Sequence, residues 1–119
     1  MTDAPFSAPS AASPTDPRIR VIGRLPLSLT AEERVEFERR SAQLAAVTRQ
    51  QDQVISYSCN ADIEVAGTYL FDEIWPSFQV FAAHLQTAHF NDWWAWVEPK
   101  LDGSLEIDYV AVTALERMP

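Results

Sequence analysis

The sequence predicts an α+β fold with the element order β-α-β-β-α-β, which is the order of a ferredoxin-like sandwich. Two kinds of pattern predict it. Four stretches alternate apolar and polar residues as strands do, and the remaining ones carry helix caps and helical spacing. The chain has 119 residues, which favours one domain. Residues 1–17, rich in Pro, Ala and Ser, are expected to be a flexible tail, and residues 18–119 the folded domain.

The first half of the domain predicts a strand, a helix and a second strand. Residues 18–27 place aliphatic side chains on one face and arginines on the other, as in a half-buried strand. Thr30 and Glu33 have the spacing of a capping box, which predicts a helix from there to about residue 50. The expected inner stripe of this helix is Phe37, Ser41, Leu44 and Val47 or Thr48. Residues 54–61 alternate again and predict the second strand.

The second half predicts a hairpin partner, two helical stretches and a last strand. Residues 68–75 alternate and pair with the preceding strand. Pro76 ends this strand, and Ser77 can cap a helix that carries spaced aromatic residues. A second helical stretch is expected over residues 87–101, and a final strand over residues 104–115.

Helices on one face of the sheet would leave the other face open. We expect tyrosine, tryptophan and aliphatic side chains on that open face, a surface that one small domain does not normally leave in water. A second copy packed sheet to sheet would cover it, so the sequence predicts a homodimer.

Composition argues against several classes of partner. Seventeen acidic residues against nine basic ones give a net charge of −8, so we expect neither a nucleic-acid partner nor binding to an anionic membrane. No apolar run reaches the length of about 18 residues that spans a bilayer. The start of the chain does not resemble a secretory signal, and Cys59 has no second cysteine to pair with. We therefore expect a cytoplasmic protein.

Aromatic residues are concentrated in one part of the sequence. Nine of the thirteen lie between Tyr69 and Trp96. A well-filled core is the ordinary explanation, because large rings are usually buried. The alternative is a flat pocket for an aromatic ligand, for which Trp75, Trp93 and Trp94 are the best candidates.

Three polar residues stand among these rings. His84 and His89 are the natural proton acceptors near pH 7, although hydrogen-bonded structural histidines are the commoner case. Five residues apart on a continuous helix, their rings would point about 140° apart, and no third ligand has fitting spacing, so no metal site is predicted. Glu73 shares a strand face with Trp75, which leaves two alternatives: a salt bridge to an arginine such as Arg24, or a place in the pocket.

Two linked motifs resemble the antibiotic biosynthesis monooxygenase family. Glu73-Ile74-Trp75 matches its Glu-x-Trp at the end of the third strand, and residues 84–90 match its His-Leu-x-(Ser/Thr)-x-His-Phe. A weaker resemblance covers about residues 18–113. It implies a dimeric α+β barrel with a pocket between sheet and helices. Relatives of this kind oxidise quinols or anthrones with O₂ and without flavin, haem or metal.

The resemblance suggests roles for particular residues. His89 or His84 would accept the proton of a quinol, phenol or anthrone, and Glu73 or Tyr57 would orient its hydroxyl group. The residues expected to hold the ring are Trp75, Phe71, Tyr57, Phe81, Trp93 and Trp94. One departure is that Gln51-Asp52-Gln53 stands where the family often has Glu-Pro-Gly, which puts the shape of that turn in question.

Two other functions remain open from the sequence. A non-catalytic dimer that binds a small aromatic ligand needs the same pocket but no base, and histidines placed away from the pocket would favour it. Haem binding or degradation is the less favoured alternative. Haem-degrading relatives use an Asn, a Trp and a His, of which only Trp75 is matched, because Gly23 and Trp94 stand near the other two positions.

Overall fold

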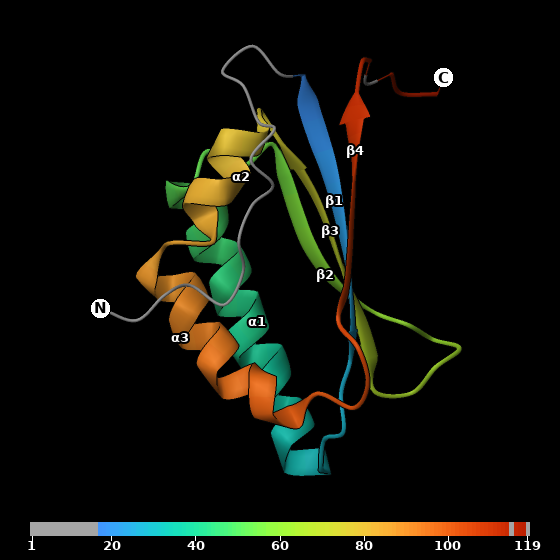
Figure 1. The fold of residues 1–119 in the computed structure, drawn as a ribbon. Helices are drawn as coiled ribbons and strands as arrows, with labels where there is room; N and C mark the ends of the chain where they lie inside the picture. The colour runs from blue at the N-terminus through green and yellow to red at the C-terminus, as the bar shows by residue number, and fades with distance from the viewer. Residues whose placement is uncertain (1–16, 115, 119) are drawn as a thin grey trace.

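The structure is a computed structural model that describes residues 17–114 and 116–118, so the expected tail lies outside the described residues except for Pro17. It forms one antiparallel sheet of order β2-β3-β1-β4 with three α-helices on one side (Figure 1), which confirms the predicted fold. The elements are β1 (Arg18–Pro26), α1 (Ala31–Gln51), β2 (Ser56–Ala61), β3 (Thr68–Trp75), α2 (Phe78–His84), α3 (Ala88–Val97), the 3₁₀ turn η1 (Glu98–Lys100) and β4 (Glu106–Val112). No described helix is long and apolar enough to cross a bilayer.

The helix α1 begins at the predicted capping box. The Thr30 N–H donates to Glu33 Oε1 at 2.9 Å, and the Glu33 N–H donates to Thr30 Oγ1 at 3.1 Å. The expected inner stripe is buried, with Thr48 rather than Val47 as its last member. The helix ends at Gln51, and Asp52 caps it by donating its backbone N–H to the Thr48 carbonyl.

The second helical region is broken where the sequence predicted two stretches. α2 ends at His84, and α3 begins with Thr87 as its N-cap. The Thr87 hydroxyl donates to the His84 carbonyl at 2.7 Å and accepts from the Phe90 N–H at 3.3 Å. This turn reorients the chain between His84 and His89, so the two residues do not share one continuous helix.

The expectation about the open face of the sheet is wrong for its tyrosine and tryptophan side chains, whereas the expected aliphatic side chains do lie there. Strand alternation turns Tyr57, Phe71 and Trp75 toward the helices, where they are buried. The opposite face instead carries an ion pair between Arg20 and Asp72, with a 2.7 Å distance between its nitrogen and oxygen, and half-exposed aliphatic side chains such as Ile22, Ile74 and Val110. The described side chains of the open face are therefore more polar than expected, and the homodimer remains a prediction.

Candidate functional site

A pocket lies between the sheet and the two helices α2 and α3. Its free volume is about 50 Å³, which is room for a few water molecules. It reaches the surface beside β4, where Ile107 lines it and is 39% exposed. The lining residues are Val21, Gly23, Leu25, Tyr57, Phe71, Glu73, Phe81, His84, Leu85, Phe90, Trp93, Trp94, Leu105 and Ile107.

Seven of the nine predicted site residues line this pocket, and two do not. Trp75 lies behind the wall, fully buried, with its ring centroid 4.8 Å from that of His84 and 5.8 Å from that of Phe81. His89 is 22% exposed and faces a separate groove of about 230 Å³ between α1 and α3. The sequence did not decide which histidine is the better candidate base. In the structure His84 lines the pocket and His89 lies at the surface.

Glu73 is the acidic group of the pocket wall. Burial raises the pKa of its carboxyl group to about 8, partly opposed by a 2.8 Å hydrogen bond from Trp75 Nε1–H to Glu73 Oε1. The alternative of a salt bridge to Arg24 is wrong, because Arg24 points to the other face and pairs with Asp62 at 3.4 Å. At pH 7 Glu73 is thus mostly a neutral acid that can donate a hydrogen bond. Burial, followed by the nearby Glu73, also raises the pKa of Tyr57 well above 10.

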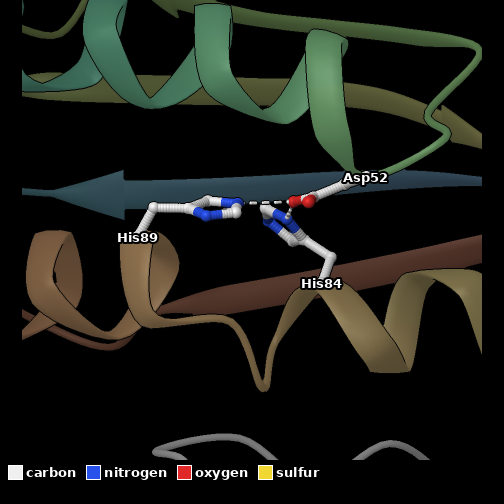
Figure 2. Close-up of side chains that lie close together, drawn as sticks. All are labelled: Asp52, His84 and His89. Atoms are coloured by element: carbon white, nitrogen blue, oxygen red, sulfur yellow. Dashed lines mark hydrogen bonds and ion pairs between the residues drawn. The ribbon is translucent and has the colours of Figure 1, made fainter.

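The two histidines meet on a carboxylate that the sequence reading did not single out. His84 Nδ1 and His89 Nε2 each lie 2.7 Å from the same oxygen, Asp52 Oδ2 (Figure 2). Asp52 comes from the end of α1, His84 from the last turn of α2 and His89 from the first turn of α3. We call these three residues the His–Asp–His cluster. A carboxylate oxygen accepts hydrogen bonds, so both ring nitrogens that face it are the protonated ones.

The cluster corrects the spacing argument against a metal site. That argument assumed one continuous helix, whereas the break at Thr87 brings both rings to Asp52. The three ligand atoms lie within 4.8 Å of one another, so this set could hold a metal ion. In the geometry seen here the 2.7 Å contacts are hydrogen bonds.

Burial is also the main influence on His84. Its side chain is 1% exposed, and burial lowers the pKa of its imidazole. The hydrogen bond and charge of Asp52 act in the opposite direction, and the charge of His89 adds to the lowering. His84 is therefore neutral at pH 7, with Nδ1–H directed at Asp52 and a lone pair on Nε2.

The sequence contained one signal for Asp52, which is its place in the turn where the family often has Glu-Pro-Gly. Gln53 occupies the glycine position of that tripeptide and adopts φ = +62°, the left-handed conformation that glycine favours. Gln53 thus adopts a conformation that a glycine at this position would take freely. Its conformation leads the chain from the end of α1 toward β2 and leaves the Asp52 side chain facing α2 and α3 (Figure 2).

The family model of antibiotic biosynthesis monooxygenases matches residues 19–96. The chain belongs to this family. A family protein from Caulobacter crescentus CB15 is 22% identical with a TM-score of 0.76, and the match covers 83% of this chain and 92% of that one. A family protein from Deinococcus radiodurans is also 22% identical, with a TM-score of 0.72 over 85% and 99% of the two chains.

SnoaB, a cofactor-independent oxygenase from Streptomyces nogalater, is 14% identical to this family member with a TM-score of 0.67. The match covers 82% of this chain and 95% of that one. At these identities the likeness shows the fold alone. No curated protein sequence matches the chain.

Proposed function

We propose that this chain is a cofactor-independent monooxygenase that oxidises a small aromatic quinol, phenol or anthrone with O₂. One observation carries the proposal: His84, a neutral base with a carboxylate partner, lines a pocket walled by aromatic rings. Family membership and the likeness to a cofactor-independent oxygenase support the same type of reaction. The alternative of a ligand-binding domain without a base is less favoured, because one of the two histidines lies at the pocket.

His84 starts the reaction by taking a proton from the substrate at Nε2. The delocalised substrate anion then gives one electron to O₂, and the radical pair combines to form a carbon–oxygen bond to a peroxide. The peroxide takes back the proton from His84. Loss of one water then breaks the O–O bond. In an anthrone, a CH₂ group and one O₂ become a carbonyl group and one water; in a phenol or quinol, a ring C–H, the hydroxyl hydrogen and one O₂ become a quinone carbonyl and one water.

The other pocket residues bind and orient. The rings of Phe71, Phe81, Trp93 and Trp94 would hold the substrate ring, with Trp75 supporting His84 from behind. Neutral Glu73 would donate a hydrogen bond to the substrate oxygen and stabilise the negative charge that develops there. Tyr57, held as a phenol, is the second candidate for this contact. His89 does not line the pocket, so we assign the base to His84.

Entry of a ring requires the pocket to widen, because about 50 Å³ holds only a few water molecules. We infer that substrate enters beside β4, where Leu105 and Ile107 form the wall and Ile107 is partly exposed.

We also propose a homodimer that packs through the open face of the sheet, and a cytoplasmic location. Light scattering of the full chain tests the dimer, and a monomeric mass at micromolar concentration rejects it.

Oxygen uptake tests the function. A hydroquinone and an anthrone are added aerobically, and uptake and the mass of the product are followed. We expect His84→Ala to slow uptake by about 10²–10⁴-fold. Arg39→Ala, on the exposed side of α1, is the control and should leave the rate unchanged.

Three results would argue against the proposal. Uptake at the wild-type rate in both His84→Ala and His89→Ala would reject a histidine base. Quenching of tryptophan fluorescence by the ring compounds without any uptake would favour the ligand-binding alternative. A Soret shift on adding hemin would favour the haem alternative.

A further inference from the structure

The His–Asp–His cluster joins the pocket to the surface through one oxygen atom. Asp52 is 7% exposed, His84 1% and His89 22%. The ends of three helices bring the three side chains together at Asp52 Oδ2 (Figure 2). The Thr87 hydroxyl, bonded to the His84 carbonyl and the Phe90 N–H, fixes the turn between the two histidines. A structural histidine needs one hydrogen-bond partner. A carboxylate that receives one N–H from the pocket and a second from the surface does more than satisfy a histidine.

We propose that Asp52 is the positioning residue of the oxidation: it fixes the His84 tautomer that leaves Nε2 as the base, and His89 tunes that base by sharing the same oxygen. This inference rests on the proposed function for its kinetic part. Its tautomer part concerns the free protein and does not depend on any substrate.

The hydrogen bond to Asp52 fixes the tautomer of His84. Neutral imidazole carries one N–H, and Asp52 Oδ2 can only accept. The 2.7 Å contact therefore places the proton of His84 on Nδ1. Asp52 itself does not line the pocket, whereas His84 does, so the nitrogen remaining for the pocket is Nε2.

Asp52 also lies where the positive charge forms when His84 is protonated. When His84 takes the substrate proton, an imidazolium forms at a side chain that is 1% exposed. An unpaired buried charge of this kind is costly. Asp52 Oδ2 at 2.7 Å compensates it without any movement. The same carboxylate thus orients the base and stabilises its protonated form.

His89 shares the hydrogen-bond acceptor of His84. Its Nε2–H donates to the oxygen that serves His84, so the two rings compete for one acceptor. The other ionisable groups around His84 are Glu73 on β3 and Tyr57 on β2, with Arg49 of α1 bonded to the Tyr57 carbonyl. The charge of Asp52 helps to raise the pKa of Tyr57, but the hydrogen-bonded partner of Asp52 that is partly exposed is His89, at 22%. We therefore assign to His89 the contact between the cluster and solvent.

Two variants should move the base strength of His84 in opposite directions. Asp52→Asn removes the charge that compensates the imidazolium and presents an amide in its place. We expect kcat to fall about 10²–10⁴-fold with KM little changed, and the acid limb of the pH–rate profile to move to lower pH. His89→Gln frees Oδ2 for His84 alone, so the acid limb should move to higher pH with only a few-fold change in kcat.

Matched variants separate these roles from a structural one. Asp102→Asn removes the same charge at an exposed position far along the chain. It should change neither kcat nor the acid limb of the pH–rate profile. Asp52→Glu keeps the carboxylate and should recover part of the rate that Asp52→Asn loses. Shifts of both acid limbs in the same direction, or no recovery by Asp52→Glu, would reject the proposed roles.

The deciding measurement is the ¹⁵N NMR spectrum of the imidazoles in the free wild-type chain, recorded with chelator. We expect Nδ1 of His84 to be protonated and Nε2 to carry the lone pair, and Asp52→Asn to raise the population of the other tautomer. A wild-type His84 protonated on Nε2 overturns the proposal, whatever the activity.

Metal analysis that finds one tightly held ion per chain, lost in Asp52→Asn, also overturns the proposal, because a metal ion would replace both N–H groups. The expected tautomer without oxygen uptake on any substrate rejects the proposed function and leaves the role of Asp52 in orienting His84.

Discussion

Glu73 and Asp52 are two carboxyl groups near one pocket, and they are built in opposite ways. Glu73 stands on a single strand and receives one hydrogen bond, from Trp75 two residues further on. Asp52 stands at the end of a helix and receives two, from imidazoles on two other helices. Burial dominates at Glu73 and raises its pKa to about 8. Two carboxyl groups close to one pocket thus have different surroundings: burial beside a single donor favours the neutral acid at Glu73, whereas one oxygen of Asp52 accepts from two imidazoles.

The largest expected effect on stability comes from the ring that supports both sites. Trp75 is 0% exposed, donates to Glu73 and packs on His84. We expect Trp75→Ala to lower the free energy of unfolding by about 3–5 kcal/mol, as for other buried tryptophans. Urea denaturation followed by circular dichroism measures it.

A second tryptophan provides the control for this variant. Trp96 is only partly buried and packs under Arg40 and Lys100, whose charged groups lie 4.9 and 3.9 Å from its ring centroid. Trp96→Ala should therefore cost clearly less than Trp75→Ala. Equal losses would show that Trp75 is not the support of the two sites.

Glu73 should make stability fall as pH rises. Its carboxyl group has a raised pKa in the folded chain, so between its ordinary value of 4.5 and about 8 the folded state binds more protons than the unfolded state. The free energy of unfolding then declines with pH by up to about 1.4 kcal/mol per unit. Glu73→Gln should remove most of this decline in urea titrations at pH 5, 6, 7 and 8. If the free energy of unfolding of Glu73→Gln falls with pH as steeply as that of the wild type, groups other than Glu73 cause the decline.

His84 should act in the opposite sense. Burial lowers the pKa of its imidazole, so below the ordinary value of 6.5 the unfolded state binds more protons than the folded state. Stability from this group is complete above pH 6.5 and is lost as pH falls toward the lowered pKa. His84→Gln should flatten this acid limb in the same urea titrations, whereas His89→Gln, at the surface, should change it less. A larger effect of His89→Gln than of His84→Gln on the acid limb would contradict the assignment of this pH dependence to the buried histidine.

The sequence predicts the Glu73–Trp75 pair better than the His–Asp–His cluster, because the pair lies within one strand and the cluster joins three helices. The fold and the Glu73–Trp75 pair depend on alternation and on spacing of two residues, which are local patterns, and the pairing of β1 with β3 follows from the element order. The cluster depends on the break at Thr87 and on the approach of α1 to the turn between α2 and α3. These are tertiary contacts over 32 and 37 residues, and no local pattern contains them. The tyrosine and tryptophan side chains were assigned to the wrong face because alternation tells which residues share a face but not which face the helices cover.

The smallest expected effect lies at Gln53, beside Asp52 in the turn. A residue with a Cβ atom at φ = +62° is strained by about 1–2 kcal/mol, whereas glycine adopts this conformation freely. Glycine also gives the unfolded chain more freedom, which offsets part of the gain. We therefore expect Gln53→Gly to raise the free energy of unfolding by about 0.5–1 kcal/mol, measured by urea denaturation, with the ¹⁵N spectrum of His84 unchanged.

Gln50→Gly, in the last turn of α1 where the backbone is helical, is the control and should lower the free energy of unfolding by a similar amount. Should Gln53→Gly instead destabilise the chain, the turn would hold Asp52 through the glutamine side chain rather than through its backbone conformation.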